Sequence, residues 1–244
     1  MQPKSIQANV TNFPRRQRRR KTRKGTLIFA ILLAVLIWGF WKLPESSTIS
    51  SPVLSTPIQQ SDDWQLLLVN RDHPLPEDYT LETVQLFNGE RIDERIYPAL
   101  QQMFDDMRAA GVYPVVASGY RTTEEQQQIL DDKIAAYEQE GYTRKEAETL
   151  AEDWVALPGT SEHQLGLAVD INADGIHSTG QEVYDWLLEN SARYGFIKRY
   201  PEDKTHITGI SNEPWHYRYV GEEAAKEMTR QNLCLEEYLA VAQP

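Results

Sequence analysis

Residues 161–172 read SEHQLGLAVDIN and combine a strand pattern with a metal-binding pattern. The second part, LGLAVDIN, is an apolar run of strand length and predicts a buried strand over 165–172. His163 precedes this run and Asp170 lies near its end, seven residues later. Because a turn or strand can bring this imidazole and carboxylate onto one cation, the stretch predicts a strand and a candidate metal site together.

Apolar runs and helical spacings on both sides of this stretch predict the remaining elements. Further strands are expected at 64–70, 112–121, 195–200 and 214–221. Helices are expected at 93–111, at 181–194, at 222–239, and as a pair within 122–154 that is split near Gly141. Because these elements alternate without regular βαβ spacing, we predict an α+β fold, a single domain with a small, mostly antiparallel sheet flanked by helices.

Two local signals support the predicted helices. The helix at 93–111 has apolar residues at spacings of 4, 3 and 4, which are Ile96, Leu100, Met103 and Met107. Thr143 and Glu146 have the spacing of a capping box, in which each residue satisfies a backbone N–H of the other. The first signal predicts which face of its helix is buried, and the second predicts where the second helix of the 122–154 pair begins.

The first 43 residues differ sharply in charge from the rest. They carry ten basic and no acidic residues, although the whole chain has 25 basic and 36 acidic residues and a net charge of −11. The remainder therefore has 15 basic residues against 36 acidic ones, a net charge of about −21. This asymmetry indicates that the two parts of the chain lie in different surroundings.

The N-terminal part reads as a membrane anchor followed by a linker. Residues 1–25 form a basic tail, and residues 26–43, TLIFAILLAVLIWGFWKL, are apolar and long enough to approach the thickness of a bilayer core of about 30 Å. Residues 44–62 are rich in Ser, Thr and Pro, which is typical of an extended linker. Under the positive-inside rule the tail stays in the cytoplasm, so we predict a single-pass protein of the cell membrane with its domain, 63–244, outside the cytoplasm.

Alternatives for this N-terminal part are less consistent with the sequence. A cleaved signal peptide has a similar layout, but the apolar run is longer than usual and no Ala-x-Ala-like site follows it. The basic run could suggest nucleic-acid binding, but a spanning segment follows at once, so no nucleic-acid partner is expected. The spanning stretch also lacks a Gly-x-x-x-Gly pattern, which gives no sign of helix pairing, and we expect a monomer.

Cys234 is the only cysteine, so the chain cannot form an intramolecular disulfide. We expect it to be a small buried residue of the last helix. Stability must then come from packing and from metal.

A third metal ligand has to come from outside the 161–172 stretch. His216, in EPWH, lies in another predicted strand, and Glu213 precedes it by three residues. Two imidazoles and one carboxylate leave one position of Zn²⁺ open, as in catalytic zinc sites. A general base must reach the water at that position without binding the metal, and Glu213 is the candidate.

Several stretches of the sequence resemble those of VanY-type D-alanyl-D-alanine carboxypeptidases, zinc peptidases that trim bacterial peptidoglycan stem peptides. The resemblance spans about residues 64–240, and its stretches are LLLVNRDHPLPEDY, ASGYRTTEEQ, LPGTSEHQLGLAVDI, YGFIKRYP and TGISNEPWHYRYVG. The most specific part is the combination of Ser-x-His-x6-Asp at Ser161, His163 and Asp170 with Glu-x-x-His at Glu213 and His216.

The resemblance implies a role for each matching residue. His163, Asp170 and His216 match the zinc ligands, and Glu213 matches the catalytic base. Arg121, in SGYR, matches the arginine that holds the scissile carbonyl or the substrate carboxylate, both of which suit a guanidinium. The remaining matches are polar positions around the substrate peptide, namely Ser118, Gln126 and Ser161.

The resemblance therefore implies a zinc-dependent D,D-carboxypeptidase that hydrolyses the terminal D-Ala from peptidoglycan stem peptides by metal-activated water. Two alternatives remain open: an L,D-carboxypeptidase acting on tetrapeptide stems, and a non-catalytic, zinc-containing wall-binding module. Single residues also have plainer interpretations, because Arg121 could pair with Glu124 or Glu125, and Glu213 with Arg218. The histidines outside the motif, His73, His177 and His206, are expected to face solvent.

Overall fold

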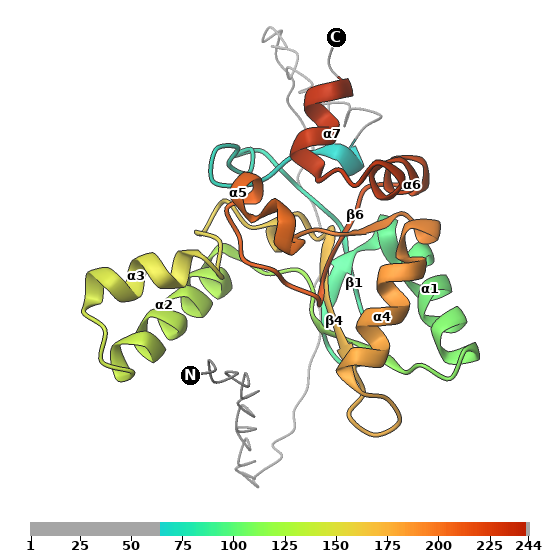
Figure 1. Cartoon of the computed structure of the whole chain (residues 1–244), viewed down its shortest axis with the longest axis horizontal. Coiled ribbons are helices and arrows are strands. Elements are labelled where there is room, and N and C mark those ends of the chain that lie inside the picture. Colours follow the sequence, from blue (N-terminus) through green and yellow to red (C-terminus); the bar gives the residue numbers. More distant parts are fainter. Residues whose placement is uncertain (1–63, 243–244) are drawn as a thin grey trace, which may run out of the picture. The chain divides into compact units, whose positions relative to one another are not determined.

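The computed structural model describes residues 64–242 of the chain (Figure 1). The predicted basic tail (1–25), membrane anchor (26–43) and linker (44–62) lie outside the described residues. Within 64–242, every helix is too short or too polar to cross a membrane.

Two antiparallel sheets form the β part of the fold. The larger sheet has the order β3-β4-β6-β5, built from β3 (Pro114–Ser118), β4 (Ala168–Ala173), β6 (His216–Tyr219) and β5 (Phe196–Lys198). The smaller one is a hairpin of β1 (Thr83–Gln85) and β2 (Arg91–Asp93). Together with the helices, these sheets confirm the predicted α+β class.

The helices are α1 (Tyr97–Ala109), α2 (Thr123–Gln139), α3 (Arg144–Glu152), α4 (Gly180–Asn190), α5 (Thr205–Thr208), α6 (Glu222–Gln231) and α7 (Leu235–Ala242). Of these, α1 to α4 begin and end near the predicted positions, whereas α5 was not predicted. The Thr143–Glu146 capping box is present at the start of α3, and similar boxes start α2 and α4. The 3-10 turns are η1 (Trp64–Leu66), η2 (Glu94–Ile96), η3 (Glu162–Leu165), η4 (Ser191–Tyr194) and η5 (Glu202–Lys204).

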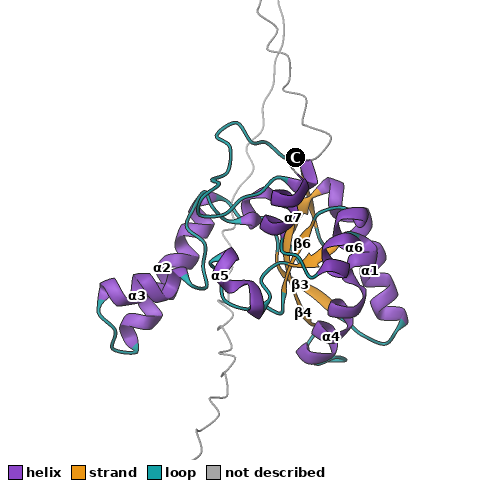
Figure 2. Ribbon diagram, turned by 45° about the horizontal axis from the view of Figure 1, so that its top comes forward, coloured by secondary structure: helices purple, strands orange, loops and turns teal. Residues whose placement is uncertain are grey.

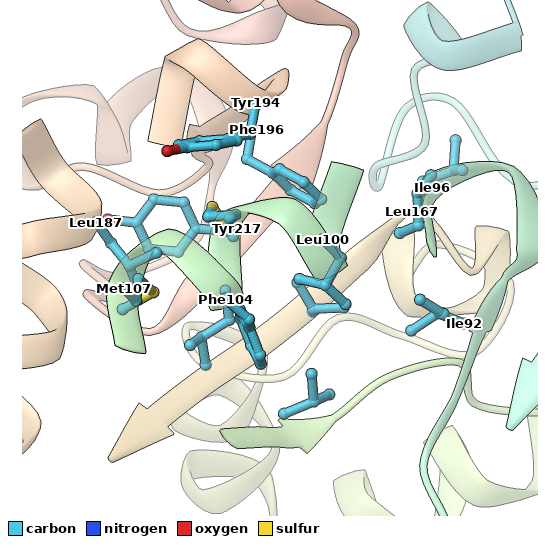
Figure 3. Close-up of a cluster of buried hydrophobic side chains, with 14 of the residues drawn as sticks. Ile92, Ile96, Leu100, Phe104, Met107, Leu167, Leu187, Tyr194, Phe196 and Tyr217 are labelled. Carbon is cyan, nitrogen blue, oxygen red and sulfur yellow. The ribbon is translucent and has the colours of Figure 1, made fainter. Parts of the chain in front are cut away.

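One face of the larger sheet forms the main hydrophobic core with α1 and α4 (Figure 3). The apolar face predicted for the helix at 93–111 is buried as expected, with Ile96, Leu100, Met103 and Met107 at most 2% exposed. From the strands, Val169, Ile171 and Tyr217 join the same cluster. Side chains alternate across a strand, so Asp170, which lies between Val169 and Ile171, points to the other face of the sheet, as does His216, the residue before Tyr217.

The helical pair α2–α3 has a small core of its own. Leu130 and Ile134 of α2 pack there against Ala147 and Ala151 of α3. In both overall views the two helices run side by side, on the other side of the sheet from α1 and α4 (Figure 2). The loops that connect this pair to the sheet are the ones that carry Arg121 and Trp154.

Three predictions about elements were wrong in part. Residues 64–70 form a 3-10 turn and an irregular segment instead of a strand, because only Asn70 makes a β-bridge, to the nearby His73. The helix predicted over 222–239 is broken into α6 and α7 by Asn232, which adopts a left-handed conformation with φ of 54°. Cys234 is buried as expected but lies in this break, just before α7.

Candidate metal centre

A row of polar side chains crosses the larger sheet on the face opposite the core. Asp170 of β4 pairs directly with His216 of β6, and with Ser118 of β3 on its other side. The pairing of β3 with β4 shifts by one residue between Val116 and Ser118. Without this irregularity, the alternation would turn Ser118 toward the core, so the shift aims it at the same face as Asp170.

His163 reaches the row from η3, the 3-10 turn that leads into β4. The turn ends at Gly166, whose φ of 71° is a left-handed conformation that favours glycine. A Cβ at Gly166 would also lie 2.5 Å from Leu81 Cδ1 and 3.0 Å from the backbone nitrogen of Asp93. The imidazole is buried, and its Nδ1 lies 2.7 Å from the carbonyl oxygen of Gly119, which leaves Nε2 directed to the site.

The three predicted ligands meet around one point. His163 Nε2 lies 3.4 Å from Asp170 Oδ1, and His216 Nδ1 lies 3.2 Å from the same oxygen. One ligand atom from each residue can be chosen so that all lie within 4.8 Å of one another. Asp170 Oδ1 is buried and has no hydrogen-bond partner among the described residues. An orphaned carboxylate oxygen facing two ring nitrogens fits a Zn²⁺ ion with nitrogen and oxygen ligands.

Arg121 holds the other oxygen of Asp170. Its Nη2 donates to Asp170 Oδ2 at 2.9 Å, its Nε to Ser118 Oγ at 2.9 Å, and its Nη1 to Gln126 Oε1 at 3.2 Å. In the structure Arg121 therefore pairs with Asp170, and not with Glu124 or Glu125 as in the alternative interpretation. With three partners in fixed directions, the guanidinium is oriented in advance at the edge of the candidate metal centre.

Glu213 is the other acid beside His216. Its Oε2 lies 3.4 Å from His216 Nδ1, and the residue is only 8% exposed. The alternative ion pair with Arg218 is absent, because that guanidinium contacts Glu162 at 2.8 Å instead. Glu213 thus lies next to Nδ1 of His216, and no lysine or arginine lies within ion-pair distance of it among the described residues.

Burial and neighbouring charges push the pKa values in this cluster apart. Burial raises the pKa of Glu213 to about 7. Burial and the nearby Arg121 lower the pKa of His163 to about 4. Burial alone would lower the pKa of His216, but the carboxylates of Asp170 and Glu162 outweigh it and raise that pKa to about 9. Burial opposes ionisation of Asp170, yet the two histidines hold its pKa well below the usual value.

A pocket opens over these groups, and it contains most of the predicted substrate contacts. Arg121, Gln126 and Ser161 line it together with the three predicted ligands and Glu213. Ser118 lies behind the arginine and contacts it through its hydroxyl. Gln126 is held by its amide, which donates to the carbonyl of Ala156 at 2.7 Å.

Other lining residues were not singled out from the sequence. These are Ile129, Trp154, Val155, Ala156, Tyr200 and Ile210. All six are apolar or aromatic, and only Tyr200 and Ile210 lie in stretches that carry the family resemblance, so no chemical pattern in the sequence marks them as pocket residues. The three histidines outside the motif, His73, His177 and His206, are exposed as expected.

Comparisons with known proteins agree with this geometry. Residues 89–222 match the family model described as "VanY: D-alanyl-D-alanine carboxypeptidase". A D-alanyl-D-alanine carboxypeptidase of Enterococcus faecalis is 65% identical over 203 residues, which cover 82% of this chain and 74% of that protein.

Two solved structures are also similar, each at 69% identity. One is a mutant of the vancomycin resistance D,D-pentapeptidase VanY from a VanB-type resistance cassette in complex with Zn(II), with a TM-score of 0.71 over 72% of this chain and 99% of that one. The other is VanYB in complex with D-alanine-D-alanine, with a TM-score of 0.72 over 72% of this chain and 98% of that one.

Proposed function

The chain belongs to the VanY family of D-alanyl-D-alanine carboxypeptidases, and from this premise we propose how its residues share the reaction. It is a zinc-dependent D,D-carboxypeptidase that acts on peptidoglycan peptides. The observation that carries the residue assignment is the convergence of His163, Asp170 and His216 beside Glu213 and Arg121 in one pocket.

We assign the zinc ligands to His163, Asp170 and His216. Two imidazoles and a carboxylate are a common ligand set of catalytic zinc, and the facing atoms are His163 Nε2, Asp170 Oδ1 and His216 Nδ1. When bound, zinc polarises a carbonyl oxygen and makes water more acidic. The protein fixes the directions of these ligands through the atom of each that faces away from the metal, here called its outer atom. The Gly119 carbonyl contacts the outer nitrogen of His163, Nδ1, and Arg121 donates to the outer oxygen of Asp170, Oδ2.

We assign the general base to Glu213. Its carboxyl lines the pocket next to His216, and burial brings its pKa to about 7, close to the value that suits proton transfer in both directions at neutral pH. In this role Glu213 takes a proton from the attacking water and later gives it to the amine of the departing D-Ala.

Arg121 is assigned to the substrate. Its side chain is 16% exposed and lines the pocket, so a guanidinium edge can meet the C-terminal carboxylate of the peptide or its scissile carbonyl. Ser118 and Gln126 act through Arg121, since each accepts a hydrogen bond from it. Ser161 is 3% exposed and remains a candidate for direct contact with the peptide at the pocket wall.

The product assay tests the function and separates it from its alternatives. Full-length protein is incubated with muropentapeptide and with murotetrapeptide, and the products are identified by mass, with a chelator added and with zinc restored. A D,D-carboxypeptidase shortens the pentapeptide by one D-Ala in a chelator-sensitive way. Cleavage of the tetrapeptide alone would establish the L,D-carboxypeptidase, and binding without cleavage of either would establish a wall-binding module.

We also propose that the chain is a monomer attached to the cell membrane by residues 26–43, with the carboxypeptidase domain outside the cytoplasm. The basic residues before this apolar stretch and the Ser/Thr/Pro-rich linker after it support this arrangement. A substrate in the wall lies on that side of the membrane, so the location and the activity are consistent with each other.

A further inference from the structure

A buried ionic cluster lies behind the candidate metal centre, on the far side of His216. It contains two arginines and two glutamates, Arg199, Arg218, Glu162 and Glu236. The side chains of Glu162, Arg199 and Arg218 are fully buried. With two positive and two negative side chains the cluster is neutral, which is the arrangement that makes burial of charges tolerable.

The two oxygens of Glu162 have different surroundings. Oε1 accepts from Arg199 Nε at 2.9 Å and from Arg218 Nη1 at 2.8 Å. Oε2 faces His216 Nε2 at 3.8 Å, about 1 Å longer than an ordinary hydrogen bond. Neither of these two atoms has a hydrogen-bond partner among the described residues, although both are buried. A buried acceptor and a buried ring nitrogen that face only each other point to an interaction between them.

The backbone explains why these atoms meet. His216 and Arg218 are two residues apart on β6, so their side chains lie on the same face of the sheet. Glu162 begins η3, next to His163, and Arg199 follows β5 and donates its backbone N–H to the carbonyl of His216 at 3.1 Å. The same strand pairing that presents His216 to the site thus brings both arginines to the carboxylate behind it.

His216 is the ligand whose outer atom lacks a close partner in this structure. The outer nitrogen of His163 lies 2.7 Å from the Gly119 carbonyl, and the outer oxygen of Asp170 lies 2.9 Å from Arg121 Nη2. Metal-bound histidines almost always donate their second N–H to a carboxylate, a carbonyl or water, which fixes the tautomer that binds the metal. Glu162 is the carboxylate in that position.

We propose that Glu162 is a positioning residue for zinc: it accepts the Nε2–H of His216 and so keeps the lone pair of Nδ1 directed at the metal. This inference rests on His216 being a zinc ligand, as proposed above. The two arginines contribute by holding Oε1, so that Oε2 is left for the histidine.

The test compares two variants of the full-length chain that change the charge of the cluster equally. Glu162→Gln can keep an oxygen toward the arginines but presents an amide N–H to His216, which favours the wrong tautomer. Glu236→Gln is the matched control, because Glu236 contacts Arg199 at 2.6 and 2.9 Å but not His216. Zinc dissociation constants are measured by competition with a chelator of known affinity.

Glu162→Gln is expected to weaken zinc binding by about 10- to 100-fold, the usual effect of losing such a partner, whereas Glu236→Gln keeps the wild-type affinity. Equal affinities for Glu162→Gln and wild type, or equal losses in both variants, would overturn the proposal. If the wild-type protein itself failed to bind zinc, the proposed function would fail instead, so the two failures are distinguishable.

A second measurement needs no variant and covers the case in which Glu162→Gln does not fold. The chain has five histidines, so ¹⁵N-histidine labelling of the wild-type protein gives few signals. With zinc bound, His216 is expected to carry a slowly exchanging proton on Nε2 and the metal on Nδ1. Metal on Nε2 of His216, or a rapidly exchanging Nε2 proton, would contradict the role of Glu162.

Discussion

Glu213 and Glu162 are both buried acids beside His216, but their surroundings give them opposite properties. Burial raises the pKa of Glu213 to about 7, and no arginine lies within ion-pair distance of it among the described residues. Burial would also raise the pKa of Glu162, but Arg199 and Arg218 more than compensate and hold it well below the ordinary value. One carboxyl can therefore exchange a proton near neutral pH while the other stays ionised, a division typical of acid–base sites.

The role of Glu213 predicts a loss of turnover without a loss of metal. Glu213→Gln removes the proton acceptor but leaves His163, Asp170 and His216 in place, so kcat for release of D-Ala should fall by about 10²- to 10⁴-fold. Zinc content after dialysis should match wild type. Glu223→Gln, whose side chain is 96% exposed, is the control. Full activity of zinc-loaded Glu213→Gln would exclude Glu213 as the base.

Cys234 offers a prediction about reactivity. Burial raises the pKa of its thiol to about 11, so at pH 8 almost all of it is protonated and unreactive in the folded protein. The folded protein therefore favours the protonated thiol more than the unfolded chain does. The stability that depends on this protonated thiol is fully present at neutral pH and declines as the pH rises toward 11. A thiol reagent at pH 8 should label native protein slowly and denatured protein quickly; equal rates would contradict the burial.

At the level of elements, the site depends on close contacts among β2, the end of β3 and η3. A Cβ at Gly119 would lie 2.1 Å from the carbonyl oxygen of Arg91 and 3.2 Å from Ile92 Cγ2. The carbonyl of the same glycine holds His163. The space beside β2 and the position of His163, a proposed metal ligand, are therefore coupled through Gly119.

Gly119→Ala should consequently weaken both folding and zinc binding. Overpacking of this kind costs about 1–3 kcal/mol of unfolding free energy, and displacement of the carbonyl frees the outer nitrogen of His163. Denaturant unfolding and chelator competition measure the two effects. The control is Gly180→Ala at the start of α4, where the nearest atom to a Cβ is 3.5 Å away on the ring of Tyr184. If Gly119→Ala changed neither the unfolding free energy nor the zinc affinity, β2 would be able to move aside without a loss of stability, and the coupling would be refuted.

At the level of the whole molecule, the predicted anchor has its own test. Arginine substitutions in the middle of a spanning helix cost about 2.5–3.5 kcal/mol each for insertion, so Leu33→Arg with Leu36→Arg should prevent stable insertion of residues 26–43. Wild-type protein should be found in the membrane fraction and the double variant should not. Ile176→Arg with Leu188→Arg, at residues that are 81% and 61% exposed and lie outside the apolar stretch, controls for the added charge and for expression. Wild type that stays in solution would refute the anchor.

The fold was predictable wherever a pattern is local. The helical spacing before Gly111, the capping box at Thr143 and the apolar run before Asp170 correspond to α1, α3 and β4. Predictions failed where the same local pattern is compatible with two different secondary structures. Residues 64–70 have strand composition but no strand beside them to pair with, and Asn232 ends a helix although the apolar spacing continues into α7.

By itself, the sequence determined the α+β class, because the order of helix and strand patterns can be read locally, and it predicted the candidate ligands from two short motifs, Ser-x-His-x6-Asp and Glu-x-x-His. The tertiary structure decided what those residues contact. The register shift that turns Ser118 toward Arg121, the pairing of Asp170 with His216, and the carboxylate of Glu162 behind that histidine all join residues far apart in the chain. Strand register and burial arise from the packing of the whole domain, so no local pattern could reveal them.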